Sequence, residues 1–314
     1  MAPKVFFVGL GNMGLGMCKN IVEKANLDQP LLVYNRTKER ATAFAESVPA
    51  GKVTVVDSID AGVAQADVVW TMLSNDQAVE DVYAQALGAA AAADPQALQK
   101  KLFIESSTIH PDTTGRVAAK VADHSATFVA APVFGAPAMA QSGQLIGVLA
   151  GSGAAIDRAR PYFKGVTSRA EVLMRDEPVG NALLLKVIGN TFILNMVEQL
   201  AEGHVLAEKT GLGTAALHGF VEQMFPGPYA AYSQRMLSGQ YHAMERPLFG
   251  VDLALKDVGH ALNVAASAGT RMLNAETGEQ HLQQVKAHDG EKGDIAGIYG
   301  AVRQEAGLPF ENTN

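Results

Sequence analysis

The sequence predicts a doubly wound α/β domain with a mostly parallel sheet over residues 1–175, followed by an all-α domain over residues 176–314. Three features support this fold class. Short apolar runs alternate with helical stretches in the first half, no comparable alternation follows residue 175, and three glycines stand directly after the first apolar run. Strands that are apolar throughout and separated by helices are typical of a parallel sheet covered on both faces. A length of 314 residues is ample for two such domains.

The predicted elements follow from this alternation. Seven apolar runs are the expected strands, at residues 5–10, 31–35, 53–56, 67–73, 101–107, 127–133 and 144–151. The stretches between them are rich in Ala, Glu, Lys and Arg, and the clearest predicted helices span residues 37–47, 76–93 and 113–123. The second half opens with one long predicted helix over residues 178–209, because Pro178 stands at its start and Gly211 just beyond its end.

Composition narrows the classes of function. The chain is 48% hydrophobic and 18% charged with a formal charge of -7, which argues against a nucleic acid or an anionic membrane as partner. A single cysteine excludes an intrachain disulfide, and no metal-ligand spacing is present, so no metal is expected. No uninterrupted apolar run is long enough to span a bilayer. The first predicted strand begins at residue 5, which leaves no room for a targeting segment, so a cytoplasmic location is expected.

The three glycines form the motif Gly9-x-Gly11-x-x-Gly14 between the first strand and the first helix. The first glycine allows a tight turn, the second lets backbone approach a pyrophosphate, and the third lets the helix pack closely on the sheet. The pyrophosphate is then bound by the helix N-terminus. A glycine-rich turn without a ligand is the alternative, but the strand and helix on either side favour a dinucleotide. The expected cofactor contacts in this loop are Gly9, Leu10, Gly11, Asn12, Met13 and Gly14.

The end of the second strand indicates which dinucleotide is bound. A protein selective for NAD usually places Asp or Glu there, to bind the ribose 2′-hydroxyl group. This chain has Asn35, Arg36 and Thr37 instead. A guanidinium group beside a 2′-phosphate forms charge-assisted hydrogen bonds, so the sequence predicts NADP(H). The alternative is that Arg36 is solvated while Thr37 caps the following helix.

Two opening stretches and five later motifs resemble one known family. Residues 7–22 and 34–37, together with ordered motifs along nearly the whole chain, resemble the β-hydroxyacid dehydrogenases. This group includes 3-hydroxyisobutyrate dehydrogenase and tartronate semialdehyde reductase and is distantly related to 6-phosphogluconate dehydrogenase. The resemblance implies a Rossmann-type domain followed by a helical domain. The later motifs lie at residues 71–74, 105–111, 131–145, 179–190 and 253–262.

The resemblance implies further contacts with the cofactor. Leu73 and Ser74 follow the fourth strand, where the family usually has Leu-Pro, and Thr108 is expected beside the nicotinamide. Lys256 is expected to reach the cofactor or to close the site from the second domain. The alternative for Lys256 is an ordinary charge pair, with Asp257 or with Asp252 one helical turn away.

Lys186 and Asn190 are the candidate catalytic residues, and also candidate substrate contacts. They are four residues apart and therefore share one helix face. Their neighbours are apolar, so Lys186 either extends its amine to water or is held in a site, and the resemblance implies the second. Reduction of a carbonyl by hydride leaves an alkoxide-like oxygen that needs a proton, which Lys186 would supply as general acid. In the oxidative direction it would accept the alcohol proton, while Asn190 would hold the ammonium group or the substrate.

The expected substrate loop departs from the family. That loop usually reads Asp-Ala-Pro-Val-Ser-Gly-Gly, whereas residues 130–136 read Ala-Ala-Pro-Val-Phe-Gly-Ala. Phe134 replaces a hydroxyl group with a large apolar ring, and Ala136 restricts the backbone. A substrate bulkier or more apolar than a small hydroxyacid is therefore expected, unless Phe134 points into the core. The expected substrate contacts in the loop are Val133, Phe134, Gly135 and Ala136.

The sequence therefore predicts a dehydrogenase or reductase that uses NADP(H) on a β-hydroxyacid or semialdehyde-type substrate. Two alternatives remain open. One is an imine reductase, although those relatives usually replace the lysine, and the other is a dinucleotide-binding module without catalysis. A homodimer or homotetramer formed through the helical domain is also expected, because segments such as residues 187–197 are apolar on more than one face.

Overall fold

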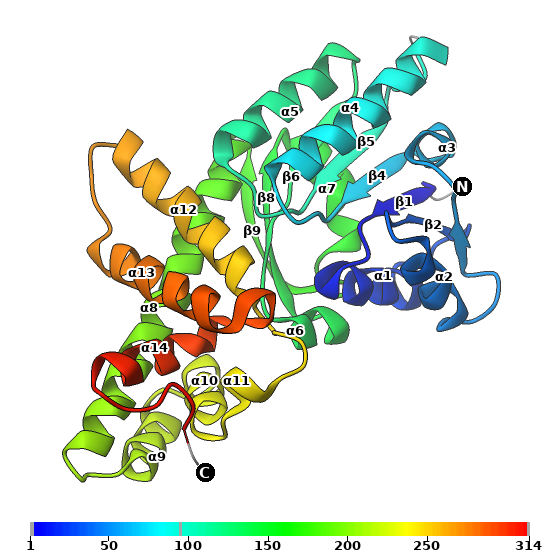
Figure 1. Cartoon of the computed structure of the whole chain (residues 1–314). Coiled ribbons are helices and arrows are strands. Elements are labelled where there is room, and N and C mark those ends of the chain that lie inside the picture. Colours follow the sequence, from blue (N-terminus) through cyan, green and yellow to red (C-terminus); the bar gives the residue numbers. More distant parts are fainter. Residues whose placement is uncertain (1–2, 94–95, 313–314) are drawn as a thin grey trace. The chain divides into compact units, whose positions relative to one another are not determined.

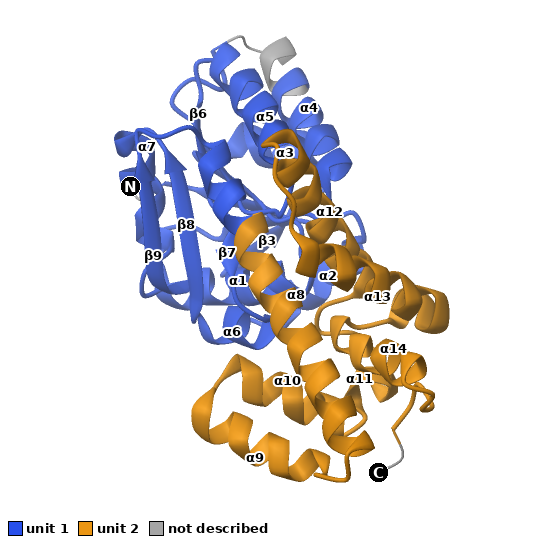
Figure 2. Ribbon diagram, turned by 90° about the vertical axis from the view of Figure 1, so that its left-hand side faces the viewer, with its two compact units in different colours: residues 1–186 blue, residues 187–314 orange. Residues whose placement is uncertain are grey.

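The structure is a computed structural model that describes residues 3–93 and 96–312. It divides into two compact units, Met1–Lys186 and Val187–Asn314 (Figure 2). The sequence placed the domain boundary at residues 175 and 176, before the long helix, whereas the division between the units falls inside that helix. Figure 1 follows the chain from the strands of unit 1 to the helices of unit 2.

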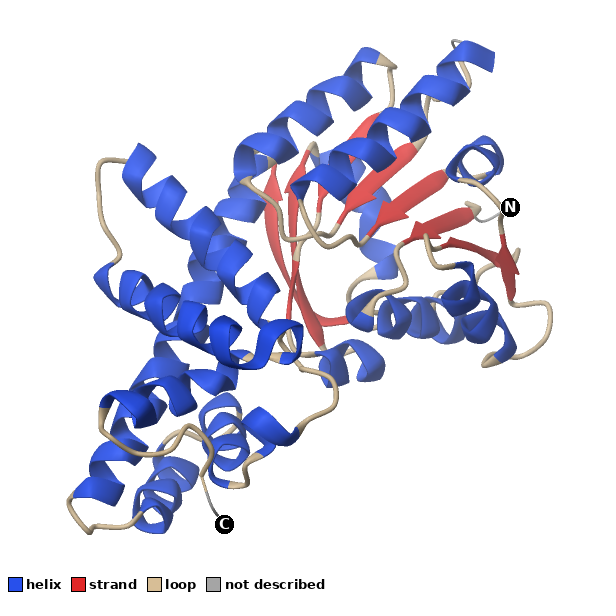
Figure 3. Ribbon diagram, viewed as in Figure 1, coloured by secondary structure: helices blue, strands red, loops and turns tan. Residues whose placement is uncertain are grey.

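Unit 1 is built on one sheet, with nine strands in the described part of the chain. The strand order is β3-β2-β1-β4-β5-β6-β8-β7, and β9 pairs with β8. Neighbours from β3 to β6 are parallel, which confirms the doubly wound, mostly parallel fold class (Figure 3). The strands are β1 (Val5–Val8), β2 (Leu31–Tyr34), β3 (Val53–Val55), β4 (Val68–Thr71), β5 (Leu102–Glu105), β6 (Thr127–Ala130), β7 (Val133–Phe134), β8 (Leu145–Gly151) and β9 (Ser168–Arg175).

The sheet differs from the prediction at its far edge. The single strand expected over residues 127–133 is divided into β6 and β7 around Pro132, which has no backbone N–H to donate to a ladder. Both β6 and β7 pair antiparallel with β8. Strand β9 was not predicted, because its residues are mostly exposed or half-buried and give no apolar run.

Helices cover both faces of the sheet because side chains alternate along each strand. Val5 and Phe7 of β1 belong to one core cluster with α1, whereas Phe6 and Val8 belong to another with α3, α4 and α5. The helices of unit 1 are α1 (Asn12–Lys24), α2 (Lys38–Glu46), α3 (Ile59–Gln65), α4 (Asp76–Ala93), α5 (Pro111–Asp123), α6 (Pro137–Ser142), α7 (Gly153–Ala159) and the short 3₁₀ helix η1 (Arg160–Tyr162).

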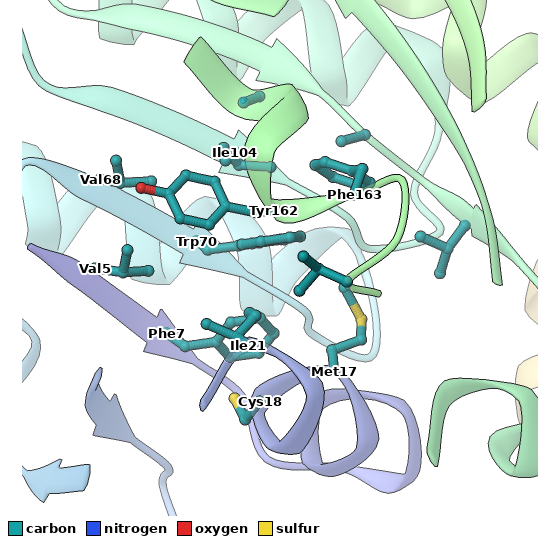
Figure 4. Close-up of a cluster of buried hydrophobic side chains, with 14 of the residues drawn as sticks. Val5, Phe7, Met17, Cys18, Ile21, Val68, Trp70, Ile104, Tyr162 and Phe163 are labelled. Atoms are coloured by element: carbon teal, nitrogen blue, oxygen red, sulfur yellow. The ribbon is translucent and has the colours of Figure 1, made fainter. Parts of the chain in front are cut away.

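Trp70 lies at the centre of the first cluster (Figure 4). Its ring centroid is 5.5 Å from that of Phe7 and 4.9 Å from that of Phe163, and its side chain is fully buried. The indole N–H donates to Ser106 Oγ at 2.8 Å, so the polar atom of this large side chain is satisfied. Trp70 therefore stabilises the sheet from within.

The regular elements of unit 2 in the described residues are all helices, as predicted. Helix α8 (Gly180–Lys209) ends before Gly211, whose φ of +78° is the left-handed conformation that terminates helices. Leu194, Val197 and Leu200 of α8 are buried in the unit 2 core. The further helices are α9 (Thr214–Met224), α10 (Pro228–Leu237), α11 (Gln240–Ala243), α12 (Val251–Ser267), α13 (Leu273–Asp289), η2 (Gly290–Lys292), η3 (Ile295–Gly297) and α14 (Ile298–Glu305).

Helix α8 also bears on the question of a membrane. The sequence predicted no membrane-spanning segment. Among the described residues, however, this one helix is long and apolar enough to cross a bilayer by length and composition. The same test is passed by core helices of water-soluble domains, and 44% of its most apolar window is buried inside the protein. The helix carries Lys186 and Asn190 in its first turns, which is consistent with a core helix that bears polar site residues.

Candidate active site

The glycine loop has the geometry that a dinucleotide needs. Gly9 has a φ of +102°, and a Cβ atom there would lie 2.2 Å from the Met72 carbonyl oxygen. A Cβ at Gly14 would lie 2.0 Å from the Gly9 carbonyl oxygen, so helix and turn touch directly. A Cβ at Gly11, in contrast, would meet nothing within 4 Å. Gly9 and Gly14 are thus required by the turn itself, while Gly11 leaves space beside the backbone.

The N-terminus of α1 suits an anion. Its N-cap residue is Gly11, which provides no side-chain cap, and the first turn contains no acidic residue. The free N–H groups and the helix dipole at this end both favour negative charge. Asn12 is exposed and Met13 half-buried, whereas the side chain of Leu10 is fully buried in the core. The residues present therefore fit a pyrophosphate group at the start of α1.

Asn35 connects the glycine loop to the end of β2. Its Oδ1 atom accepts a hydrogen bond from the Leu10 backbone N–H at 2.9 Å, and its Nδ2 donates to the Thr37 carbonyl oxygen at 2.9 Å. Thr37 occupies the N-cap position of α2, but its side chain makes no capping hydrogen bond. Arg36 is exposed, while Lys38 is paired with Asp57 at 2.6 Å. The capping role considered for Thr37 is absent, and Arg36 is a solvent-facing cation at the position that discriminates between NAD and NADP.

The loops that follow β4 and β5 are joined by hydrogen bonds. The Leu73 backbone N–H donates to Ser107 Oγ at 2.7 Å. Thr108 is half-buried beside this bond, and Ser74 is exposed. His110 accepts from the Asp112 backbone N–H at 3.2 Å and caps helix α5, so this histidine has a structural role. Leu73, Ser74 and Thr108 thus lie on two neighbouring loops at the carboxyl edge of the sheet, where ligands bind in folds of this kind.

A buried carboxyl group lies directly beneath these loops. Glu105 is fully buried, and burial raises the pKa of its carboxyl group to about 7 against the opposing effect of hydrogen bonds from Ser107 and Thr71. A carboxyl group that titrates near neutral pH next to a candidate site is typical of functional regions. Glu105 is the first residue of the motif at residues 105–111, but no role could be assigned to it from the sequence, because its hydrogen-bond partners are not visible in the motif.

Lys186 lies against Phe134 within unit 1. The lysine is only 8% exposed, and its Nζ atom is 4.5 Å from the centroid of the Phe134 ring. Phe134 is half-buried and also packs against the second core cluster of the sheet. The ring therefore touches both the core and the candidate proton donor, so the two interpretations of Phe134 offered by the sequence are not exclusive.

The other residues of the loop that the motifs predict to contact substrate differ in exposure. Val133 is 3% exposed, so its side chain faces the core. Gly135 is exposed with a φ of +136°, which other residues rarely adopt, and Ala136 is exposed at the N-cap of α6. Helix α6, which follows this loop, is held against α1 by buried Asn20, whose Nδ2 donates to the Gly16 and Ala140 carbonyl oxygens at 2.8 and 2.9 Å.

Within unit 2, Asn190 and Lys256 meet at a shared acid. Asn190 Nδ2 donates to Asp257 Oδ2 at 2.6 Å, and Lys256 Nζ lies 3.1 Å from Asp257 Oδ1. Asp257 is 6% exposed, so this pair is not an ordinary surface charge pair. Asp252 pairs with Lys286 instead, at 2.8 Å. The sequence did not identify Asp257 as the residue that links Asn190 to Lys256, because α8 and α12 are far apart along the chain.

No group of three or more His, Cys, Asp or Glu side chains within residues 3–93 and 96–312 could hold a metal ion.

A sheet with a glycine loop at its first turn, followed by a helical domain, defines the two-domain oxidoreductases that bind a nicotinamide dinucleotide. Residues 4–174 match the NAD-binding domain of 6-phosphogluconate dehydrogenase, and residues 180–302 match the NAD-binding domain of NADP-dependent 3-hydroxyisobutyrate dehydrogenase. The chain belongs to the β-hydroxyacid dehydrogenase family, in agreement with the resemblance seen in its motifs.

Individual relatives support this membership. The chain is 37% identical over 299 residues to the NADH-dependent oxidoreductase ucdB of Aspergillus ustus, covering 95% of this chain and 98% of the relative. It is 25% identical to the structure of Mycobacterium tuberculosis 3-hydroxyisobutyrate dehydrogenase with L-serine, with a TM-score of 0.80 and coverage of 96% and 100%. An imine reductase of Streptomyces aurantiacus is 18% identical with a TM-score of 0.61 and coverage of 96% and 99%, a likeness of fold alone. The protein is thus an oxidoreductase of the dehydrogenase type that acts on CH–OH groups.

Proposed function

We propose that the protein is an NADP(H)-dependent reductase of carbonyl compounds related to β-hydroxyacids and semialdehydes, with Lys186 as its general acid and base. The observation that supports this most directly is the burial of Lys186 at 8% exposure on the motif helix α8. A lysine that only extended to solvent from a core helix would expose its amine. An amine that lies against an aromatic ring and is largely removed from water is suited to proton transfer.

The chemistry divides between cofactor and protein. The bound nicotinamide supplies or accepts the hydride. Lys186 donates a proton to the carbonyl oxygen of the substrate during reduction, and takes it back from the alcohol during oxidation. Asn190 positions a polar group one helical turn further on, and its bond to Asp257 at 2.6 Å fixes the orientation of its amide. The substrate carboxylate would meet the exposed backbone of Gly135 rather than a hydroxyl group, because Phe134 stands where the family has serine.

The preference for NADP(H) over NAD(H) is the second part of the proposal. No acidic side chain stands at the end of β2, and Asn35 is occupied by the glycine loop and by Thr37. Arg36 is exposed next to it, whereas Lys38 is neutralised by Asp57. The relative from Aspergillus ustus is described as NADH-dependent, so cofactor choice requires a direct test in this chain.

The substrate class follows from Phe134. Its ring removes a hydrogen-bonding hydroxyl group and adds an apolar surface beside Lys186. We therefore propose carbonyl substrates with an apolar group larger than that of tartronate semialdehyde. Consumption of NADPH with a panel of semialdehydes, 3-oxoacids, aromatic aldehydes and cyclic imines tests this. Turnover of apolar aldehydes or oxoacids is expected, and turnover of cyclic imines alone would overturn the proposal.

A further inference from the structure

Two adjacent parallel strands of unit 1 end in a closed ring of hydrogen bonds. Thr71 ends β4 and Glu105 ends β5, and the two residues are paired in register. Thr71 Oγ1 donates to Glu105 Oε2 at 2.5 Å, and the Ser107 backbone N–H donates to Glu105 Oε1 at 2.5 Å. Ser107 Oγ accepts from the Leu73 backbone N–H at 2.7 Å, which closes the ring. The carboxyl group of Glu105 therefore fixes the loop after β4 against the loop after β5.

This carboxyl group is costly to bury. Thr71, Glu105 and Ser107 are each at most 1% exposed. A buried carboxyl group must be hydrogen-bonded or neutral to be tolerated, whereas an apolar side chain would fill the same space without that cost. Burial raises the pKa of Glu105 to about 7. The cost of burying this carboxyl group therefore indicates a role for Glu105 beyond packing.

The ring lies where the proposed cofactor site needs rigid backbone. The strand order reverses at β1 and β4, and in doubly wound sheets ligands bind outside the carboxyl ends of strands next to that point. Strand β5 is the next neighbour of β4 (Figure 1). The two loops carry Leu73, Ser74 and Thr108, which the motifs predict to contact the cofactor, with Thr108 beside the nicotinamide.

We propose that Glu105 is a positioning residue, which holds the loops after β4 and β5 in the arrangement that orients the nicotinamide ring. The inference rests on the proposed function, because it assumes that these loops contact the cofactor. Glu105 acts through Leu73 and Ser107, since its own carboxyl group is buried beneath them. The adenosine half of the cofactor, at the glycine loop and Arg36, does not depend on this ring.

The ring tolerates a neutral side chain of the same shape. Thr71 Oγ1 also lies 3.3 Å from the Ile104 carbonyl oxygen and 3.3 Å from the Tyr83 hydroxyl group. When Glu105 is protonated, its O–H donates to Thr71 Oγ1, and the threonine hydroxyl turns to Ile104. A glutamine reproduces this pattern, with its amide N–H in place of the acid O–H. Asp76, at the start of α4, acts on Glu105 through space and also raises the pKa of its carboxyl group.

The test compares Glu105→Leu with Glu105→Gln in the full-length protein. Calorimetry measures the affinity of each variant for NADPH and for 2′-phospho-ADP-ribose, which lacks the nicotinamide. Leucine leaves the buried Ser107 N–H without an acceptor and removes the link from Thr71 to Ser107, so it is expected to weaken NADPH binding about tenfold while changing fragment binding less than about twofold. Glutamine is expected to restore NADPH affinity and the rate of hydride transfer in a single turnover to within about threefold of wild type.

A matched control comes from the neighbouring residue. Ser106→Ala removes one buried hydrogen bond, from Trp70 Nε1 at 2.8 Å, in the same segment but outside the ring. It is expected to leave the ratio of the two affinities unchanged. If Glu105→Leu does not fold, Thr71→Val removes one donor with nearly the same shape and is expected to change the ratio in the same direction.

Equal weakening of NADPH and fragment, or no weakening of either, would overturn the inference and leave the proposed function standing. Failure of the proposed function is distinguished by the Lys186→Met variant. In that case Lys186→Met retains its turnover, whatever the Glu105 variants do to cofactor binding.

Discussion

The Nζ atom of Lys186 lies 4.5 Å from the centre of the Phe134 ring. This is within the range of about 6 Å over which a cation interacts with an aromatic face. The lysine comes from the first turns of α8, and the phenylalanine from β7, so the contact joins two motifs that are far apart in sequence. The side chain that departs most from the family pattern is thus in contact with the residue proposed to move the proton.

The first prediction concerns the substrate. Phe134→Ser removes the apolar surface and restores a hydroxyl group, so the ratio of kcat/KM for small polar hydroxyacids over bulky apolar substrates is expected to rise about tenfold or more. Phe134→Leu keeps an apolar side chain and is the control, with an expected ratio close to wild type. If Phe134→Ser only lowers the melting temperature and leaves the ratio unchanged, the ring is a core residue.

The second prediction concerns the cofactor. Because a charge-assisted hydrogen bond contributes about 1.5–3 kcal/mol, NADPH is expected to bind at least about tenfold more tightly than NADH, and Arg36→Ala should remove most of that difference. Lys38→Ala is the matched control, since Lys38 is exposed and already paired with Asp57. Fluorescence titration of both cofactors measures the preference. Equal affinities in the wild type, or a preference that survives in Arg36→Ala, would refute the assignment.

The third prediction concerns stability and pH. The pKa of Glu105 is raised by burial, so its contribution to folding is complete below about pH 4.5 and is lost as the pH rises through about 7. The Glu105→Gln side chain does not ionise. The free energy of unfolding of this variant should therefore rise relative to that of wild type by roughly 3 kcal/mol between pH 4.5 and 8, the order expected for a pKa raised from 4.5 to about 7.

The comparison between variant and wild type is needed because another group titrates in the same direction. The hydrogen bond that His281 donates to the Glu198 carboxylate raises the pKa of His281 to about 8, so the stability that His281 contributes is also lost as the pH rises through that value. Chemical denaturation at several pH values measures the difference between Glu105→Gln and wild type. A difference that stays constant with pH would show that Glu105 titrates normally.

Much of the fold could be predicted from the sequence, for physical reasons that differ between elements. Strands such as β1 and β4 are buried on both faces because helices cover both. Glycine is required at positions 9 and 14 because a Cβ atom there would lie 2.2 and 2.0 Å from a backbone carbonyl oxygen. Strand β9 was not predicted, because an exposed edge strand does not need an apolar run. The break between β6 and β7 was not predicted, because Pro132 lies within an apolar run and interrupts the strand only by lacking a backbone N–H.

The residues of the candidate site could be predicted only in part from the sequence. Motif positions such as Lys186 and Thr108 can be recognised because the resemblance preserves their spacing. Glu105 and Asp257 could not be recognised, since their importance lies in partners 34 and 67 residues away, Thr71 and Asn190. Long-range hydrogen bonds leave no periodic signal in a single sequence.

The fourth prediction concerns self-association. Phe220 and Met224 share one face of α9 and are 54% and 62% exposed, and Phe192 on α8 is 72% exposed. Apolar side chains of this size gathered in one unit indicate a surface that is covered in solution. Light scattering is expected to give a multiple of 33.0 kDa, and Phe220→Ser should shift the distribution toward the monomer. A stable wild-type monomer at micromolar concentration would contradict this.

The central claim is that Lys186 transfers the proton, and single-turnover kinetics of Lys186→Met test it most directly. Methionine keeps an unbranched side chain and removes the amine, so folding and NADPH affinity should be nearly unchanged. Lys209→Met, at the far end of the same helix, is the control and should retain native turnover. With saturating NADPH and the best substrate, turnover of Lys186→Met is expected to fall by about two to four orders of magnitude. A rate close to that of wild type would show that the proton comes from another group and that the mechanism is wrong.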